Sequence, residues 1–181
     1  MSAKIRGLLE HDLLWGLRLG AAVVLCIQVL TWIGLGLTFW TWTLTYVLVV
    51  VFAVLGARSL RKRAAARPGV VRTLVLITLM ILVSRVIYQT YMFAYLNFVD
   101  PTWVDTVAEV WSAQLRQAGA ADEKIAMNIA DFRNQWETGY IFSIGIIRWG
   151  IPQFILGLVA AAVSAVWSWR RSSVPSAETA G

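Results

Sequence analysis

The sequence contains four long apolar stretches, at about residues 13–37, 40–57, 70–96 and 139–169. A helix needs about 20 mostly apolar residues to cross the hydrocarbon core of a bilayer. Only 14% of the 181 residues are charged, whereas soluble domains carry about 25%. The sequence therefore predicts an all-α integral membrane protein with four transmembrane helices. We expect residues 1–171 to form one four-helix membrane domain and residues 172–181 a disordered tail.

The segment between the third and fourth apolar stretches is polar but has apolar residues at helical spacing. Asp100 and Pro101 are typical of a helix start, with the aspartate as N-cap and the proline at the first helical position. Apolar residues then recur with a helical period over residues 104–115 and again over residues 125–136, and Gly119 lies between the two runs. This pattern predicts a helical hairpin over residues 101–136 with one apolar side.

The distribution of charge predicts the orientation of the chain. Lysines and arginines gather before the first stretch, between the second and third, and after the fourth: Lys4, Arg6, Arg58, Arg61, Lys62, Arg63, Arg67, Arg72, Arg170 and Arg171. Residues 100–137 instead carry seven acidic and three basic residues, a net charge of −4. Because basic residues are retained on the cytoplasmic side of a membrane, we expect both termini in the cytoplasm and an extracytoplasmic hairpin.

Two arginines lie within the predicted spans at similar depth. At 1.5 Å per residue, Arg85 lies about 15 Å and Arg148 about 14 Å from the outer ends of their spans. An arginine at the bilayer centre costs at least about 2.5–3.5 kcal/mol, so it should face the bundle interior or water. Tyr88 and Gln89 share a polar helix face with Arg85, and Gln28 lies near the same level. We expect the two arginines to face each other, with these three residues within reach.

Two interpretations of these arginines remain open. In the first they are structural and hold the helices in register: they bond to glutamines, tyrosines or a carbonyl such as that of Arg148, which Pro152 leaves without its helical donor, or they pair with acidic residues of the outer segment. In the second they form a cationic pocket for a carboxylate, a phosphate or a lipid headgroup. The predicted spans contain no carboxylate, which favours a ligand that supplies the negative charge.

Several other kinds of site are excluded or weak. The chain has one histidine, His11, and one cysteine, Cys26, whereas a zinc site needs three or four ligands. No nucleophile elbow, H-E-x-x-H motif or phosphate loop is present, so we predict no catalytic residues, no metal, no cofactor and no enzymatic activity. Nucleic-acid binding is excluded because the basic residues flank apolar spans. Gly16 and Gly20 match the small-xxx-small pattern of helix contacts.

The distinctive features of the second half are a tyrosine-rich end of the third span, the Asp100-Pro101 break, the turn that begins at Gly119, and a glycine-containing last helix that ends at Arg170-Arg171. In these features, from about residue 88 to 171, the chain resembles the bacterial family known as domain of unknown function 4199. The resemblance implies a multi-pass inner-membrane protein with a helical insert between the last two spans, and it implies no activity.

Two functions follow from these observations. The sequence favours a non-enzymatic accessory or interaction protein of the bacterial inner membrane, which contacts the lipid bilayer and a membrane protein partner or a second copy of itself. The alternative is a small transporter or binding protein for an anion or lipid headgroup, with Arg85, Arg148, Gln89, Tyr88 and Gln28 as ligand-binding residues. The apolar side of the hairpin can meet a partner, the membrane surface or, most simply, the protein's own spans.

Overall fold

A computed structural model describes residues 3–33, 39–63, 69–137, 140 and 142–172. Over these residues the chain forms six α-helices and one π-helical turn and contains no strand, so the predicted all-helical class is confirmed. The elements are α1 (Ala3–Trp32), α2 (Phe39–Arg63), α3 (Val70–Ala94), η1 (Tyr95–Val99), α4 (Trp103–Gln117), α5 (Asp122–Asn134) and α7 (Ile144–Ser172).

Among the described residues, four segments are long and apolar enough to cross a membrane: Arg6–Trp32, Thr43–Lys62, Val70–Val99 and Ile146–Val166. Two of the helices extend beyond the predicted spans, because α1 begins at Ala3 and α2 continues to Arg63. Apolar composition marks the part of a helix that suits lipid, whereas backbone hydrogen bonding can continue into polar surroundings. The last helix instead begins later than predicted, at Ile144.

Several predicted features lie outside the described residues. They are the end of the first span over residues 34–37, the basic loop over residues 64–68, the first residue of the predicted fourth span, Gly139, and the tail over residues 173–181.

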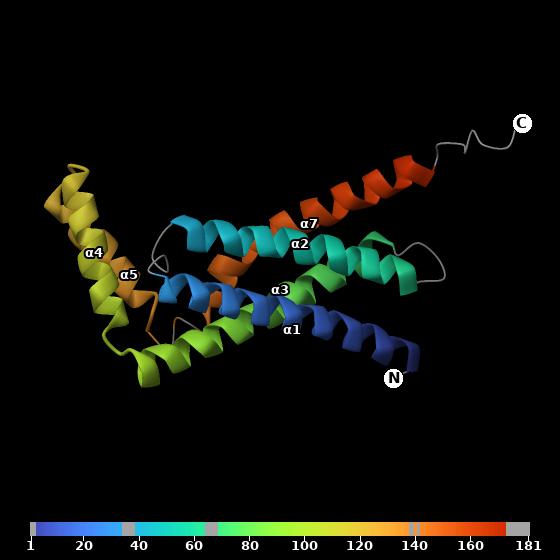
Figure 1. Cartoon of the computed structure of the whole chain (residues 1–181), viewed down its shortest axis with the longest axis horizontal. Helices are drawn as coiled ribbons and strands as arrows, with labels where there is room; N and C mark the ends of the chain where they lie inside the picture. The colour runs from blue at the N-terminus through green and yellow to red at the C-terminus, as the bar shows by residue number, and fades with distance from the viewer. Residues whose placement is uncertain (1–2, 34–38, 64–68, 138–139, 141, 173–181) are drawn as a thin grey trace, which may run out of the picture.

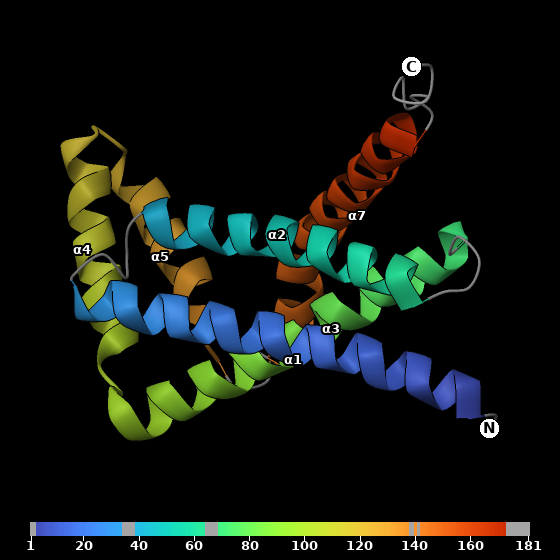
Figure 2. The same cartoon turned by 45° about the vertical axis from the view of Figure 1, so that its right-hand side comes forward.

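The four long helices lie side by side, and the shorter pair α4 and α5 lies across one end of them (Figures 1 and 2). Helix α1 packs along α3, α2 packs against α7, and α3 also contacts α7. The start of α1 and the end of α7 lie at the opposite end of the bundle from α4 and α5 (Figure 1). This arrangement leaves α4 and α5 packed mainly on each other.

The bundle core is built from small and branched apolar side chains, and two glycines allow α1 to approach α3 closely. A Cβ atom on Gly16 would lie 2.7 Å from Cβ of Val83, and one on Gly20 would lie 2.6 Å from Cδ1 of Ile87. A larger residue at Gly16 would require the two helices to shift, because Cβ of Val83 cannot move apart from its backbone, whereas one at Gly20 would at least displace the Ile87 side chain. The prediction that these glycines form a helix contact is therefore confirmed.

The break after the third span lies where the sequence placed it, but its capping differs. The N-cap of α4 is Thr102 rather than Asp100. Asp100 Oδ1 instead accepts hydrogen bonds from the backbone N–H of Thr102 at 3.1 Å and from its hydroxyl at 2.8 Å. Aspartate stabilises such turns as readily as it caps helices. The predicted N-cap is therefore wrong by two residues.

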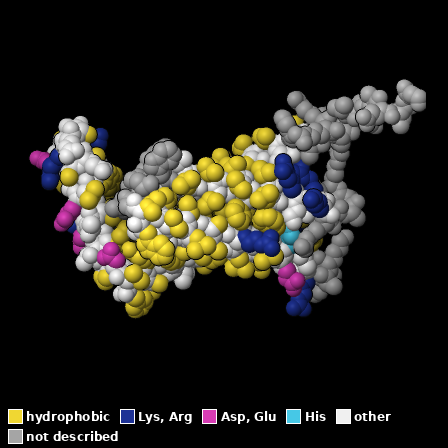
Figure 3. Space-filling model, viewed as in Figure 1, with side chains coloured by type: hydrophobic (Ala, Val, Ile, Leu, Met, Phe, Trp, Pro, Cys, Tyr) yellow, Lys and Arg dark blue, Asp and Glu magenta, His cyan; other side chains and the backbone are white. Residues whose placement is uncertain are grey.

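Apolar side chains cover the middle of the molecule, over the long helices (Figure 3). Large residues such as Leu25, Ile147 and Val163 are more than 60% exposed there. Soluble monomers rarely expose apolar patches of this extent. Together with the four long apolar helices, this surface indicates a membrane protein.

Candidate functional site

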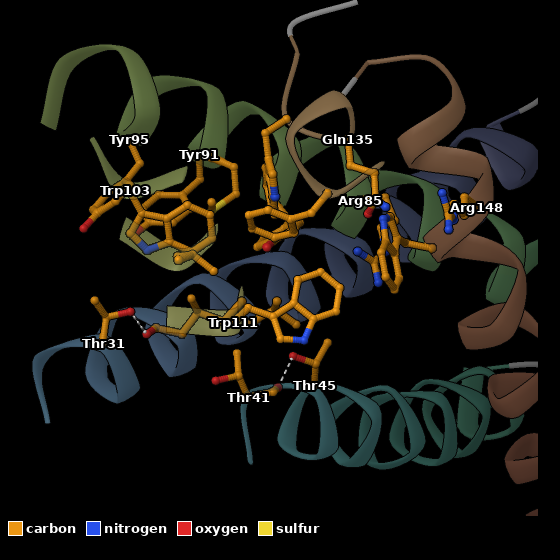
Figure 4. A pocket seen from close by; sticks show the side chains of 18 of the residues that line it. Thr31, Thr41, Thr45, Arg85, Tyr91, Tyr95, Trp103, Trp111, Gln135 and Arg148 are labelled. Carbon is orange, nitrogen blue, oxygen red and sulfur yellow. Dashed lines mark hydrogen bonds between the residues drawn. The ribbon is translucent and has the colours of Figure 1, made fainter. Parts of the chain in front are cut away.

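A cavity of about 540 Å³ lies between the α4–α5 pair and the adjoining end of the long helices. Every α-helix of the described chain contributes to its lining, and η1 contributes Tyr95. Its volume falls within the range of about 300–1,000 Å³ that is typical of small-molecule sites. Arg85 and Arg148 lie toward one side of this cavity, and Tyr95 and Trp103 toward the other (Figure 4).

Arg85, on α3, is the more deeply placed of the two arginines, with only 6% of its surface exposed. Its Nε donates a hydrogen bond to Oε1 of Gln153 on α7 at 3.0 Å. The guanidinium carbon lies 5.7 Å from the centre of the Tyr88 ring, within range of a cation–π interaction. Within the described part of the chain, no carboxylate forms an ion pair with Arg85.

Arg148, on α7, lies at the edge of the cavity. Its Nη1 donates a hydrogen bond to the Tyr140 hydroxyl at 2.9 Å, and its Nη2 lies 3.6 Å from Oδ2 of Asp131 on α5. Its side chain is 45% exposed. The depth expected from the sequence was too large, because it assumed a helix that begins at Gly139 and α7 begins at Ile144.

Aromatic side chains from α4 and α5 form one wall of the cavity. The Trp103 and Trp136 rings meet edge to face with centres 5.3 Å apart, and Phe132 contacts both of them. Trp111 meets Phe132 edge to face at 5.7 Å. All four residues line the cavity, so the apolar side that the sequence predicted for this pair faces the rest of the chain. This wall is apolar and polarisable, and suits an apolar or aromatic ligand body.

One buried donor in the cavity lining lacks a partner. The indole Nε1 of Trp136 is buried and makes no hydrogen bond to any described residue. Buried polar groups are nearly always hydrogen-bonded, and an unpaired one costs about 1–3 kcal/mol. The Nε1 atom itself is enclosed by protein, so the donors that the cavity offers to an acceptor are the two Nη groups of Arg85, which make no hydrogen bond to any described residue.

The structure brings together three of the five residues predicted to bind a ligand. Arg85, Arg148 and Tyr88 line the cavity, whereas Gln28 and Gln89 are not among its lining residues. Gln28 accepts a hydrogen bond from the hydroxyl of Tyr91, which itself lines the cavity. Gln89 is buried, and its Oε1 has no partner among the described residues. Their ligand-binding role stays a prediction.

A second polar cluster lies far from the cavity, and the sequence analysis missed it. It consists of His11, Asp12 and Trp15 on α1, Ser59 on α2 and Arg72 on α3, and we call it the His11–Asp12 cluster. The Arg72 Nη groups bond both oxygens of Asp12 at 2.5 and 2.6 Å. Nε2 of His11 lies 3.0 Å from the Ser59 hydroxyl and accepts a hydrogen bond from the Trp15 indole at 3.1 Å.

The sequence contains a signal for this cluster. Asp12 and Arg72 each stand at the start of an apolar stretch, and the first and third of four consecutive spans run parallel, so these opposite charges come to one level when the two helices are neighbours. The clustering of basic residues between the second and third stretches groups Arg72 with the basic loop and hides this pairing. Asp12 is only 1% exposed, and its bidentate pairing with Arg72 neutralises both charges.

The polar groups that line the cavity are ones that can bind a ligand. In the described part of the chain, no three histidine, cysteine, aspartate or glutamate side chains lie close enough to hold a metal ion. The polar groups of the lining are arginines, tyrosines, threonines, glutamines, tryptophan indoles and a single carboxylate, Asp131. Such groups orient and neutralise a ligand, whereas nucleophilic catalysis needs a nucleophile beside a base.

One comparison with known proteins gives a match. A family model described as protein of unknown function (DUF4199) matches residues 14–164. No curated protein and no solved structure matches the chain. The matched range includes every residue of the cavity lining.

Proposed function

The chain belongs to the family described as protein of unknown function (DUF4199), and we propose that it is a multi-pass protein of the bacterial inner membrane that binds an anionic ligand in the cavity under α4 and α5. It acts as a binding or transport protein and carries out no covalent chemistry. Its lipid-facing surface is the apolar surface of the four long helices.

The observation that carries this proposal is the environment of Arg85. A buried charge is expensive unless it is paired and hydrogen-bonded. Arg85 has one neutral hydrogen-bond partner, Gln153, and lies against the Tyr88 ring. Because it borders a cavity and pairs with no carboxylate among the described residues, an anion in the cavity supplies the missing charge.

The proposed orientation places α4 and α5 outside the cytoplasm. The net charge of −4 over residues 100–137 and the basic residues at the other end of the helices support it. The start of α1 and the end of α7 lie opposite α4 and α5 (Figure 1), so both termini are cytoplasmic in this arrangement.

The accessory role ranks below ligand binding. It rested on an apolar hairpin side that could meet another protein, and Trp103, Trp111 and Trp136 on that side line the cavity instead. A membrane protein partner or a second copy of the chain stays a sequence-based prediction.

Fluorescence quenching tests the binding proposal. Bromine quenches tryptophan emission on contact, and four tryptophans line the cavity. We expect ω-bromoundecanoate, added to the detergent-purified protein, to give a saturable quenching component. Arg85→Gln should remove that component. Arg18→Gln is the matched control, because Arg18 is exposed on α1 and lies over the Trp15 ring outside the cavity. Saturable quenching that persists unchanged in Arg85→Gln contradicts the proposal.

Thiol labelling tests the orientation. In a Cys26→Ser background, cysteines introduced at the exposed positions Lys62 and Ala118 should react from opposite sides of the membrane. A membrane-impermeant maleimide added to intact spheroplasts should label Ala118→Cys and spare Lys62→Cys until the membrane is permeabilised. The reverse pattern would place α4 and α5 in the cytoplasm.

A further inference from the structure

We infer that the ligand is an amphipathic monoanion, with one negatively charged group of two or more oxygens on an apolar body. This inference rests on the proposed function and adds the ligand's charge and shape. The shared chemistry fits two sources, a free long-chain or aromatic carboxylate and the phosphodiester of a monoanionic phospholipid.

The net charge of the lining limits the ligand to one negative charge. Three lining residues are ionic at neutral pH: Arg85, Arg148 and Asp131. Asp131 lies 3.6 Å from Arg148, which Tyr140 also holds, so these two charges balance each other. The remaining charge of +1 belongs to Arg85. A dianion would retain an uncompensated charge or would have to displace Asp131 from Arg148.

The free hydrogen-bond donors favour a group with two oxygens. The Nε of Arg85 is occupied by Gln153 at 3.0 Å, and this leaves its two Nη groups as a fork. Such a fork matches the paired oxygens of a carboxylate or a phosphodiester. The two Nη groups make no hydrogen bond to any described residue, so an anion can be bound by direct hydrogen bonds.

The walls and the volume of the cavity favour a ligand with an apolar body. Val23, Ile27, Met92 and Val107 line the cavity together with the aromatic wall of α4 and α5. A volume of about 540 Å³ is far larger than an inorganic anion needs. The aromatic rings retain large flat faces (Figure 4) that contribute affinity only when apolar surface covers them. A small hydrophilic anion such as chloride or phosphate would leave these walls wet.

A chain-matched series of brominated probes tests the inference. The series is ω-bromoundecanol, ω-bromoundecanoate and ω-bromoundecyl phosphate at pH 8, where the phosphate is mostly a dianion because its second pKa is about 6. We expect the carboxylate to bind at least about tenfold more tightly than either other probe. A tenfold ratio of dissociation constants is what one favourable charge interaction contributes in a partly exposed site. Inorganic phosphate should not compete.

The outcomes separate this inference from the proposed function. If no probe gives saturable quenching that depends on Arg85, the proposed function is wrong. If the dianion or the alcohol binds as tightly as the carboxylate, the ligand class is wrong and the binding function stands. Phosphatidylglycerol that competes more strongly than undecanoate, while phosphatidylcholine does not compete, identifies a lipid as the source, whereas competition by undecanoate but not by phosphatidylglycerol identifies a free acid.

A charge variant tests the same point without removing the arginine. Asp131→Asn raises the charge of the lining by one, so the affinity for the phosphate probe should rise about tenfold relative to the carboxylate probe. Asp122→Asn is the matched control, because Asp122 is on the same helix and outside the cavity. Should Arg85→Gln fail to fold, Gln153→Glu supplies an internal carboxylate beside Arg85 and should block the carboxylate probe. An unchanged preference in Asp131→Asn, or undiminished binding in Gln153→Glu, overturns the inference.

Discussion

Arg72 and Arg85 lie on the same helix, but only Arg72 has a carboxylate partner among the described residues. Arg72 bonds both oxygens of the buried Asp12 and also the backbone carbonyl of Leu8. Arg85 is more deeply buried and bonds only the neutral Gln153. A buried arginine that pairs with its own chain's carboxylate stabilises the fold, whereas one that lacks such a partner and borders a cavity is available to a ligand.

The largest expected effect comes from removing the carboxylate of Asp12, the partner of Arg72. Asp12→Asn should lower the free energy of unfolding in detergent by about 3–5 kcal/mol, because it leaves Arg72 as an uncompensated charge. Chemical denaturation followed by circular dichroism measures this loss. Glu10→Gln is the matched control, because the Arg6–Glu10 pair is exposed on the same helix and should contribute little. Equal effects of the two substitutions would show that the Asp12–Arg72 pair is not a structural pair.

Adding a carboxylate beside Arg85 should make its surroundings resemble those of Arg72. Gln153→Glu places a carboxylate where Oε1 now accepts the hydrogen bond from Arg85. We expect a gain of about 1–3 kcal/mol in the free energy of unfolding of the ligand-free protein, the range for hydrogen bonds between charged groups. The same denaturation experiment reports it, and a loss of stability would mean that the Arg85 charge is already compensated.

Removing the Arg85 side chain should have little effect on the free energy of unfolding. Arg85→Gln loses one hydrogen bond but also a buried charge, so the free energy of unfolding should change by no more than about 1 kcal/mol. Thermal unfolding of the ligand-free protein checks this. A loss as large as that of Asp12→Asn would assign Arg85 a structural role, which is the interpretation that the sequence left open.

The smallest effect is expected at the edge of the cavity. Arg148→Gln removes a half-exposed side chain whose partners are Tyr140 and Asp131. We expect unchanged thermal stability and a weaker affinity for ω-bromoundecanoate, since Asp131 is then left unbalanced in the lining. The fluorescence titration should show a smaller loss than for Arg85→Gln. A complete loss would make Arg148 the main anion ligand.

The sequence predicted the parts of this molecule that depend on local pattern. Long apolar runs predicted the four long helices, and the spacing of glycines predicted the close contact of Gly16 and Gly20 with α3. The burial of Arg85 followed from its place in an apolar run. Each of these features is decided by residues near one another in the chain or by the cost of exposing a charge to lipid.

The remaining features depend on contacts between distant residues. Asp12 and Arg72 are 60 positions apart, and although both stand at the start of apolar stretches, that pattern does not say which helices are neighbours. The cavity depends on how α4 and α5 lie over the long helices, so the place of Trp136 in its lining was not predictable. Gln28 and Gln89 are on the helices expected from the sequence but are not among the residues that line the cavity, because the face that a helix turns to a cavity depends on how it packs against distant helices.

The π-helical turn η1, over Tyr95–Val99, acts as an angular spacer between the long helices and α4. Each residue of an α-helix turns the chain by about 100° around the axis, and a π-helical turn accommodates one extra residue. If one residue were deleted from η1, the exit direction of the chain would rotate by about that angle. Trp103 and Trp111 on α4 would then be turned relative to the long helices, and the aromatic wall that they form with Phe132 would be disrupted.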